Sequence, residues 1–349
     1  MSTSSSPGSI LITGANGGLG SAIVKQIINS PDLSKLHGIY TVRKVETATA
    51  LSSTLSHSKR DHSHDTLALD LSTLANVRGF AHGINKRVAE GSLPPIRALI
   101  LNAGFQEQAT QTLTDDGFDI SFECNYLSHW LLVLLLLQSM DTEHGRIVVI
   151  GSFTHDPYDP RMKTMDFYPD DKWRTMIHDT ESIARGTWST AKEDPSKLSG
   201  MRRYGASKLC QIMMIPELQR RLNNDPALSN ISVLGVDPGA MPSGLLRRGN
   251  FMLSVVMGKI ALPLLAAVNS VVSPNSEFRS TATSAGDVLW AAFDVATIGE
   301  HPKGLYHYQR KDFETSAEAR DQAKQAMLWR DSISYTGITA RETSLAAWN

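Results

Sequence analysis

Short apolar runs alternate with longer segments of helical spacing along most of this chain. Most of the runs are continuous, which is typical of strands buried on both faces of a parallel sheet. The predicted strands are Ser9–Thr13, Gly38–Val42, Thr66–Leu69, Arg97–Leu101, Arg146–Ile150, Ile231–Val236 and Lys303–His307. Between them, segments such as Ser21–Asn29 and Leu209–Asn223 have a helical period. Repeated strand–helix alternation predicts an α/β fold with a parallel sheet covered by helices.

Two apolar stretches require a test as membrane segments. Leu131–Leu137 is far shorter than the ~20 residues that span a bilayer, and we interpret it as a buried helix. Phe251–Val272 is 22 residues long but contains Lys259 and Pro263, which disfavour a spanning helix. We therefore interpret this second stretch as an apolar lid or a subunit surface. Contact with a membrane surface is conceivable but not favoured, because no basic cluster beyond Arg247 and Arg248 flanks it.

Composition narrows the class of protein. The chain has 349 residues, of which 41% are apolar, so it can form a packed core. Its 34 basic and 35 acidic residues give a formal net charge of −1, which argues against a nucleic-acid partner. Two cysteines, Cys124 and Cys210, and an N-terminus without signal-peptide order predict a reducing, cytoplasmic location. No Cys/His spacing indicates a metal site.

The first chemical motif is a glycine-rich turn, Thr13-Gly14-Ala15-Asn16-Gly17-Gly18-Leu19-Gly20. It follows the first predicted strand and opens the first predicted helix, where backbone N–H groups and the helix dipole favour a phosphate. Glycines also let the backbone approach a pyrophosphate closely. The pattern therefore predicts a dinucleotide site, although a tight connection alone would also use glycine. The candidate contacts are Gly14, Asn16, Gly17, Gly18, Leu19 and Gly20.

The end of the second predicted strand suggests which dinucleotide binds. An acidic residue there would bind the ribose 2′-hydroxyl of NAD, whereas a cation accommodates the 2′-phosphate of NADP. The strand ends in Arg43 and Lys44, with no carboxylate before Glu46. This favours NADP(H), the alternative being that both cations are simply solvated.

Further motifs resemble those of the short-chain dehydrogenase/reductase family. Tyr204-Gly205-Ala206-Ser207-Lys208 is its Y-x-x-x-K pair, and Ser152 follows a strand where the family places its catalytic serine. Asn125 matches the family's catalytic asparagine. The resemblance implies a doubly wound, seven-stranded sheet of order 3-2-1-4-5-6-7. It also implies cofactor contacts, besides Tyr204 and Lys208, at Asp70, Leu71, Asn102, Ala103, Gly104, Pro238, Gly239, Met241 and Ser243.

The chemistry is reasonable from the residues themselves. Tyr204 and Lys208 are four apart and share one face of a helix. A nearby ammonium would favour the phenolate, so that Tyr204 acts as acid or base, while Ser152 hydrogen-bonds the carbonyl oxygen. By analogy with the family, Asn125 would hold a water that connects Lys208 to solvent.

Two departures from the compact family pattern stand out. Fifty-two positions separate Ser152 from Tyr204, an insertion like that of retinol dehydrogenases, WW-domain oxidoreductase and light-dependent protochlorophyllide reductase. Its aromatic residues either roof an apolar substrate pocket or pack within a surface excursion. They are Tyr158, Phe167, Tyr168, Trp173 and Trp188. The second departure is the apolar segment 251–272, in the place of the family's lid.

These observations predict a single domain over residues 1–349, with an insertion at 155–200, a lid at 244–280 and a C-terminal extension at 310–349. In that extension Ser316–Trp329 has helical character. The predicted activity is an NADP(H)-dependent carbonyl reductase or alcohol dehydrogenase for a lipophilic small molecule such as a steroid, retinoid or polyketide. The alternatives are reduction of C=C or C=N, a cyclisation or isomerisation on the same fold, and a non-catalytic NADPH-binding scaffold. The helix 125–140 resembles the one relatives use to form homodimers, but burial within one subunit explains it equally well.

Overall fold

One sheet organises the protein. The computed structural model describes residues 7–58, 60–165, 167–241 and 279–349. Its strands are β1 (Ser9–Ile12), β2 (His37–Val42), β3 (His64–Ala68), β4 (Ile96–Leu101), β5 (Arg146–Ile150), β6 (Ser232–Asp237), β7 (Tyr306–Tyr308) and β8 (Lys311–Asp312). They lie in the order β3-β2-β1-β4-β5-β6-β7-β8, which confirms the predicted order of the first seven. Of the predicted lid, residues 244–278 lie outside the described part of the chain, and so does Ser243.

The last two strands differ from the prediction. The strand expected at Lys303–His307 begins at Tyr306, because Gly304 has a left-handed φ of 64°. An eighth strand, β8, pairs antiparallel with β7. Gln309 and Arg310 connect the two with φ values of 56° and 58°, as in a type I′ hairpin turn. Two residues are too short for a hydrophobic pattern to reveal.

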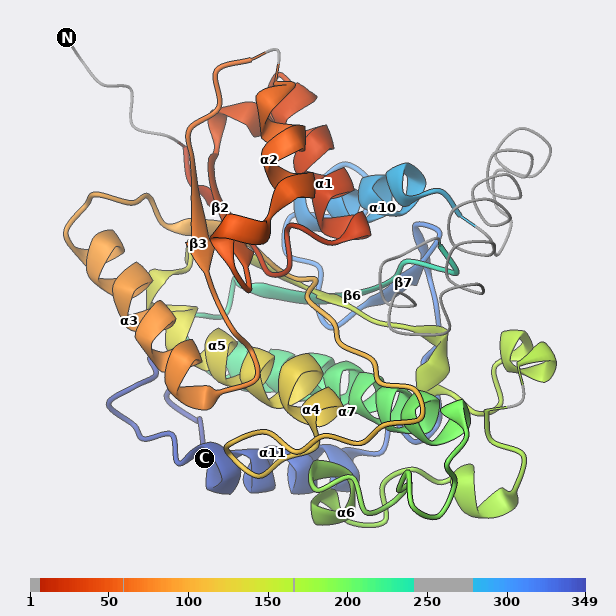
Figure 1. Ribbon diagram of the computed structural model, residues 1–349. Helices are drawn as coiled ribbons and strands as arrows, with labels where there is room; N and C mark the ends of the chain where they lie inside the picture. Colours follow the sequence, from red (N-terminus) through yellow and green to blue (C-terminus); the bar gives the residue numbers. More distant parts are fainter. Residues whose placement is uncertain (1–6, 59, 166, 242–278) are drawn as a thin grey trace, which may run out of the picture.

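Helices cover both faces of the sheet (Figure 1). On one face lie α1 (Gly18–Asn29), α2 (Thr49–Ser56) and α10 (Thr281–Phe293). On the other lie α3 (Leu74–Ala89), α4 (Ile120–Phe122), α5 (Ser128–Leu136) and α7 (Lys197–Asn223), with α11 (Gln322–Thr336) outside them. The insertion contributes α6 (Thr180–Ala184) and the 3₁₀ turns Phe153–His155, Pro160–Thr164 and Asp171–Trp173. This is the doubly wound arrangement that the sequence predicted.

The core forms two layers separated by the sheet. Successive residues of β1 enter opposite layers: Ile10 and Ile12 join the cluster under α1 and α10, whereas Leu11 joins the cluster under α5 and α7. All three are fully buried, which explains why this run of the strand is apolar without alternation.

The predicted buried helix at Leu131–Leu137 is confirmed. Every residue of α5 is buried, and the 3₁₀ turn Leu137–Ser139 continues it. Within the described part of the chain, Ile120–Ser139 is long and apolar enough to cross a membrane, but 89% of its apolar window is buried in the protein. The chain itself covers this helix, which agrees with burial within one subunit, one of the two explanations given above for the helix 125–140.

The C-terminal extension packs on the same layer. Its helix α11 begins later than the predicted Ser316, because Asp321 caps the N-terminus by accepting from Ala323 N and Lys324 N. The helix ends where Gly337 adopts φ 60°. Trp329 of α11 reaches Trp130 of α5, so the extension is part of the core.

Candidate active site

Predicted site residues gather where the parallel strands end. Asp70 lies two residues beyond β3, and Thr13, Arg43 and Asn102 directly follow β1, β2 and β4. Ser152 lies two residues beyond β5. Because the carboxyl ends of parallel strands share one edge, the sheet brings these residues together there.

The glycine-rich turn has the geometry of a phosphate cradle. Gly14 has φ 66°, and a Cβ placed on Gly20 would clash with the Gly14 carbonyl oxygen. Gly17, the N-cap of α1, makes no side-chain capping hydrogen bond. The first turn of α1 therefore offers backbone N–H groups to a phosphate without competition from a cap.

Thr13 joins this cradle to the next strand. Its hydroxyl oxygen accepts from Asn102 N and Ala103 N, both at 2.9 Å. In return, Asn102 Nδ2 donates to the carbonyl oxygens of Thr13 at 2.8 Å and Gly14 at 3.2 Å. These bonds fix the predicted Asn102-Ala103-Gly104 turn against the glycine-rich turn.

Three of the predicted cofactor contacts have structural partners of their own. Asn16 Oδ1 accepts from Leu51 N of α2 at 3.0 Å. Asp70 Oδ1 accepts from the backbone and hydroxyl of Ser72. The Leu71 side chain packs in the core layer under α5 and α7.

Arg43 and Lys44 are both exposed at the end of β2. Within the part of the chain that the structure describes, neither forms an ion pair, and the following Glu46 is exposed as well. The guanidinium and ammonium are therefore available to an anionic group bound beside the cradle.

Ser152, Tyr204 and Lys208 lie close together in the structure. Tyr204 is 8% exposed, and a hydrogen bond joins its side chain to that of Ser152. Lys208 Nζ lies 5.6 Å from the centre of the Tyr204 ring. Burial raises the pKa of Tyr204 above its ordinary value, more than the Ser152 hydrogen bond lowers it. Burial lowers the pKa of Lys208 to about 7.

This electrostatic balance differs from the expected one. We expected the Lys208 ammonium to favour the phenolate of Tyr204. In the structure burial dominates, and the buried carboxylate of Asp237 raises the pKa of both Tyr204 and Lys208. Tyr204 is therefore a neutral phenol at pH 7.

Asn125 lies in a π-helical turn, Glu123–Leu127, in which Ser128 N donates to Glu123 O. Such wide turns are frequent at functional sites. The Asn125 side-chain amide accepts from Phe105 N and donates to Phe105 O, and it also donates to Ser207 Oγ at 2.8 Å.

The ammonium of Lys208 has two acceptors. Lys208 Nζ donates to Ile150 O at 2.9 Å and to Gln211 Oε1 at 2.7 Å. Gln211 is thus a site residue that the sequence analysis missed. It could have been found from its position three residues after Lys208, which places the two side chains on the same face of the helix.

The turn after β5 is held by a residue from the C-terminal extension. His155 Nδ1 bonds Ser152 O at 2.7 Å, and Ser316 N donates to His155 Nε2 at 3.2 Å. Since a carbonyl oxygen only accepts, Nδ1 carries the proton and Nε2 is free to accept. One neutral imidazole therefore links Ser152 to the extension.

Comparisons with known proteins bear on the family of this chain. Residues 9–161 match the family model of the short chain dehydrogenases. The chain is 48% identical to the short-chain dehydrogenase iccH of Talaromyces variabilis, over 98% of this chain and 99% of that protein.

The chain belongs to the short-chain dehydrogenase family.

Two further likenesses concern the branch and the fold of this short-chain dehydrogenase. It is 27% identical to human retinol dehydrogenase 13, over 95% of this chain and 85% of that protein. This supports the branch predicted from the insertion. The fold resembles that of the angucycline C-6 ketoreductase LanV with bound NADP, with a TM-score of 0.53, 19% identity and coverage of 87% and 95% of the two chains.

The insertion of this short-chain dehydrogenase is anchored to the catalytic helix α7. Arg203 is buried and bonds Ser189 O at 2.7 Å and pairs with Asp119 at 3.0 Å. The Arg202 guanidinium lies 4.3 Å from the centre of the Trp173 ring. Both arginines directly precede Tyr204, so the insertion packs against the start of the catalytic segment.

The five aromatic residues of the insertion differ in burial and in the elements that they pack against. Tyr158 is 68% exposed, whereas Phe167, Tyr168 and Trp173 are buried in the core layer under α7. Trp173 and Trp188 pack edge to face. Only the Trp173–Trp188 pair therefore packs ring against ring within the insertion, and neither of the two interpretations describes all five rings. Tyr168 alone lies close to the site, where its hydroxyl donates to Thr154 O and lies against Gly205.

A second missed residue is Arg161. Its guanidinium pairs with Asp159 at 2.7 Å and with Asp237 at 3.0 Å, and all three side chains are at most 8% exposed. It lies 4.7 Å from the centre of the Phe153 ring and 4.6 Å from that of Tyr308. Arg161 thus joins the insertion to the end of β6, next to Gly239, which adopts φ 72° and donates to Asp237 Oδ1.

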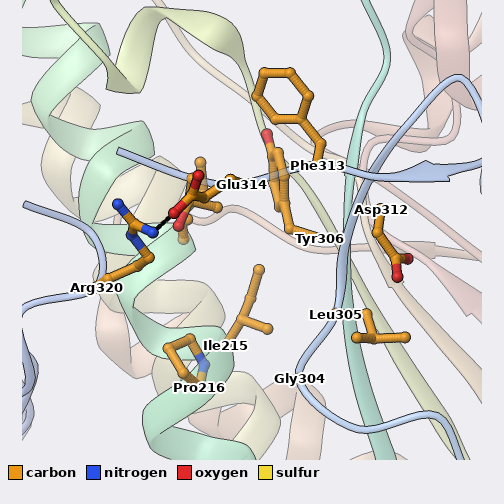
Figure 2. Close-up of a pocket in the computed structure, with 11 residues that line it drawn as sticks. Ile215, Pro216, Gly304, Leu305, Tyr306, Asp312, Phe313, Glu314 and Arg320 are labelled. Carbon is orange, nitrogen blue, oxygen red and sulfur yellow. Dashed lines mark ion pairs between the residues drawn. The ribbon is translucent and has the colours of Figure 1, made fainter. Parts of the chain in front are cut away.

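A pocket of ≈ 470 Å³ lies between α7 and the β7–β8 hairpin (Figure 2). Ile215 and Pro216 of α7 line one side, and Tyr306 and Phe313 line the other. Arg320 and Glu314 form an ion pair at its margin. Its lining includes none of the cradle residues or the Ser152–Tyr204–Lys208 group, although a Cβ on Gly151 would meet the Tyr306 hydroxyl.

Proposed function

We propose that this short-chain dehydrogenase uses NADP(H) to interconvert a carbonyl and an alcohol on a lipophilic small molecule, with reduction as the favoured direction. The observation that carries the proposal is the convergence of Ser152, Tyr204 and Lys208 beside a cradle that fits a pyrophosphate. The family relationship and the NADP bound in the resembling ketoreductase structure support it.

The cradle would hold the dinucleotide through chain groups already described. The open first turn of α1 would hold the pyrophosphate, and Arg43 and Lys44 would supply cations to a 2′-phosphate. When bound, NADPH supplies the hydride, and orientation and proton transfer fall to the protein.

Tyr204 acts as the acid in this proposal. Burial keeps its phenol protonated at pH 7, so it can donate a proton to the oxygen of a carbonyl being reduced. Ser152 Oγ, which accepts from Thr154 Oγ1 at 2.9 Å, can donate its own proton to the same oxygen. Lys208, with a pKa of about 7, carries partial positive charge near the ring and favours the phenolate left behind.

The substrate class rests on relatives and on composition. The chain resembles enzymes named for retinol and for an angucycline ketone, both lipophilic carbonyl or alcohol compounds. The net charge of −1 offers no excess of either sign for a charged substrate. We propose a polyketide, retinoid or steroid ketone or aldehyde, in secondary metabolism, and a cytoplasmic location in keeping with two free cysteines.

The test is NADPH oxidation, followed by absorbance, with a panel of steroid, retinoid and polyketide carbonyls. We expect at least one to be reduced, and Tyr204→Phe to lower kcat by about a hundredfold or more while NADPH binding is kept. Tyr335→Phe, a tyrosine on α11, is the matched control and should leave kcat unchanged. Undiminished turnover by Tyr204→Phe would remove Tyr204 as the acid. Tight NADPH binding without oxidation by any compound would instead favour a non-catalytic scaffold.

A further inference from the structure

A fully buried histidine lies between the Asn125 turn and the nucleotide cradle. His129 is four residues after Asn125 and 0% exposed. Its Nδ1 lies 2.8 Å from Asn125 O, and its Nε2 lies 2.9 Å from Thr13 Oγ1. Thr13 is the residue that accepts from Asn102 N and Ala103 N.

The partners determine which nitrogen carries the proton. Asn125 O can only accept, so Nδ1 must be the donor. Thr13 Oγ1 already accepts two backbone N–H groups. Its own hydroxyl hydrogen can point at His129 Nε2, 2.9 Å away, or at Ile100 O, 3.5 Å away, and the shorter contact with an unprotonated nitrogen is the better acceptor. In this arrangement each donor and acceptor of the imidazole has one partner. Burial and the nearby Lys208 lower the pKa of His129 to about 4, so the ring is neutral at pH 7.

Gln211 closes the same cluster on the side of α7. Its Nε2 lies 3.4 Å from His129 Nδ1, and its Oε1 accepts from Lys208 Nζ at 2.7 Å. Since Nδ1 and the Gln211 amide nitrogen are both donors in this arrangement, the ring only packs against Gln211 of α7, and its two hydrogen bonds go to Asn125 O and Thr13 Oγ1. Polar groups buried in this way are costly unless every partner is present, so the cluster has one favourable arrangement.

We propose that His129 is a positioning residue that holds the Asn125 turn and the Thr13–Asn102–Ala103 cradle in a fixed relation. This rests on the proposed function, in that the cradle binds NADPH and Asn125 belongs to the catalytic group. The Nε2 link sets the geometry of the cradle, and the Nδ1 link sets that of the π-helical turn.

Substitution of His129 by Asn or by Gln tests its two hydrogen bonds separately. The nitrogen of Asn occupies the place of Nδ1, so His129→Asn keeps the donor to Asn125 O and loses the Thr13 contact. The longer His129→Gln keeps an acceptor for Thr13 and loses the Asn125 contact. His129→Leu removes both. Ser139→Ala is the control, since it deletes a buried hydrogen bond, to Asn85 Oδ1, away from the site.

The readouts are the NADPH dissociation constant, measured by fluorescence, and amide hydrogen exchange of the protein without nucleotide. We expect His129→Asn to raise the dissociation constant about tenfold and to speed exchange in peptides covering 96–105, with little change in 120–130. We expect His129→Gln to speed exchange in 120–130, to keep the dissociation constant within about threefold, and to lower kcat rather than raise KM on any substrate found.

Equal effects of both variants on both readouts, or effects no larger than those of Ser139→Ala, would overturn the proposal in favour of general packing. Failure of the proposed function would look different. If no carbonyl is reduced, the dissociation constants still decide, and if NADPH does not bind to the wild-type protein, hydrogen exchange without nucleotide still tests both links.

Discussion

Trp130 of α5 and Trp329 of α11 meet edge to face, with ring centroids 5.1 Å apart and ring planes at 72°. Both side chains are at most 2% exposed. Trp329 also donates from Nε1 to Trp348 O, and the Arg221 guanidinium lies 4.4 Å from the centre of its ring. The C-terminal extension therefore completes the core layer beside the catalytic helix.

Trp329→Ala should lower the free energy of unfolding by about 3–5 kcal/mol, because it leaves a large cavity against Trp130. Chemical denaturation measures this loss. Tyr158→Ala is the control, since that ring is 68% exposed, and its effect should stay within about 0.5 kcal/mol. Similar losses for the two variants would contradict the assignment of α11 to the core.

Arg43→Ala should weaken NADPH binding about tenfold or more and leave NADH binding unchanged, because a charge-assisted bond to the 2′-phosphate is lost. Competition titrations with the two nucleotides give the ratio. Lys25→Ala, an exposed lysine on α1, is the matched control for a lost positive charge. Equal weakening toward both nucleotides would mean that Arg43 does not distinguish them.

Glu123→Gln should stabilise the protein increasingly as pH rises. Burial raises the pKa of Glu123 from 4.5 to about 8. Between these values the folded state binds more protons than the unfolded state, so the glutamate contribution to stability falls as pH rises. Glutamine does not titrate and keeps an oxygen for the Thr114 hydroxyl. The melting temperature of Glu123→Gln relative to wild type should therefore be higher at pH 8 than at pH 5, by about 2 °C or more. A constant difference across this range would argue against a buried, protonated Glu123.

Arg161→Met should destabilise the protein by about 3–5 kcal/mol, since it leaves Asp159 and Asp237 buried without their cation. Methionine keeps an apolar stem between Phe153 and Tyr308, so the loss reports the charges. Arg174→Met is the control, because its pair with Asp171 is largely exposed. If thermal denaturation showed no difference between the two variants, Arg161 would not anchor the insertion.

Predictability differs sharply between the parts of this site. β1, β4 and β5 each contain an uninterrupted apolar run because both of their faces are buried, so their positions and the residues after them could be predicted from the sequence. Tyr204 and Lys208 are four apart on one helix, which is also a local relationship. Arg161 and Asp237 are 76 residues apart, and His155 and Ser316 are 161 apart. No periodicity encodes such contacts, because they depend on how the insertion and the extension fold back. The π-helical turn at Asn125 was hidden as well, since a single widened turn leaves the apolar pattern of α5 intact.

The link from Ser316 through His155 to Ser152 has a consequence for biosynthesis. A ribosome makes the chain from the N-terminus, so the cradle, Ser152, Tyr204 and Lys208 all emerge before residue 316. During that interval the turn carrying Ser152 lacks its outermost hydrogen bond and Trp130 lacks its cover. We expect the nascent chain to hold every catalytic side chain yet to expose an apolar helix, and thus to depend on chaperones until α11 has been released.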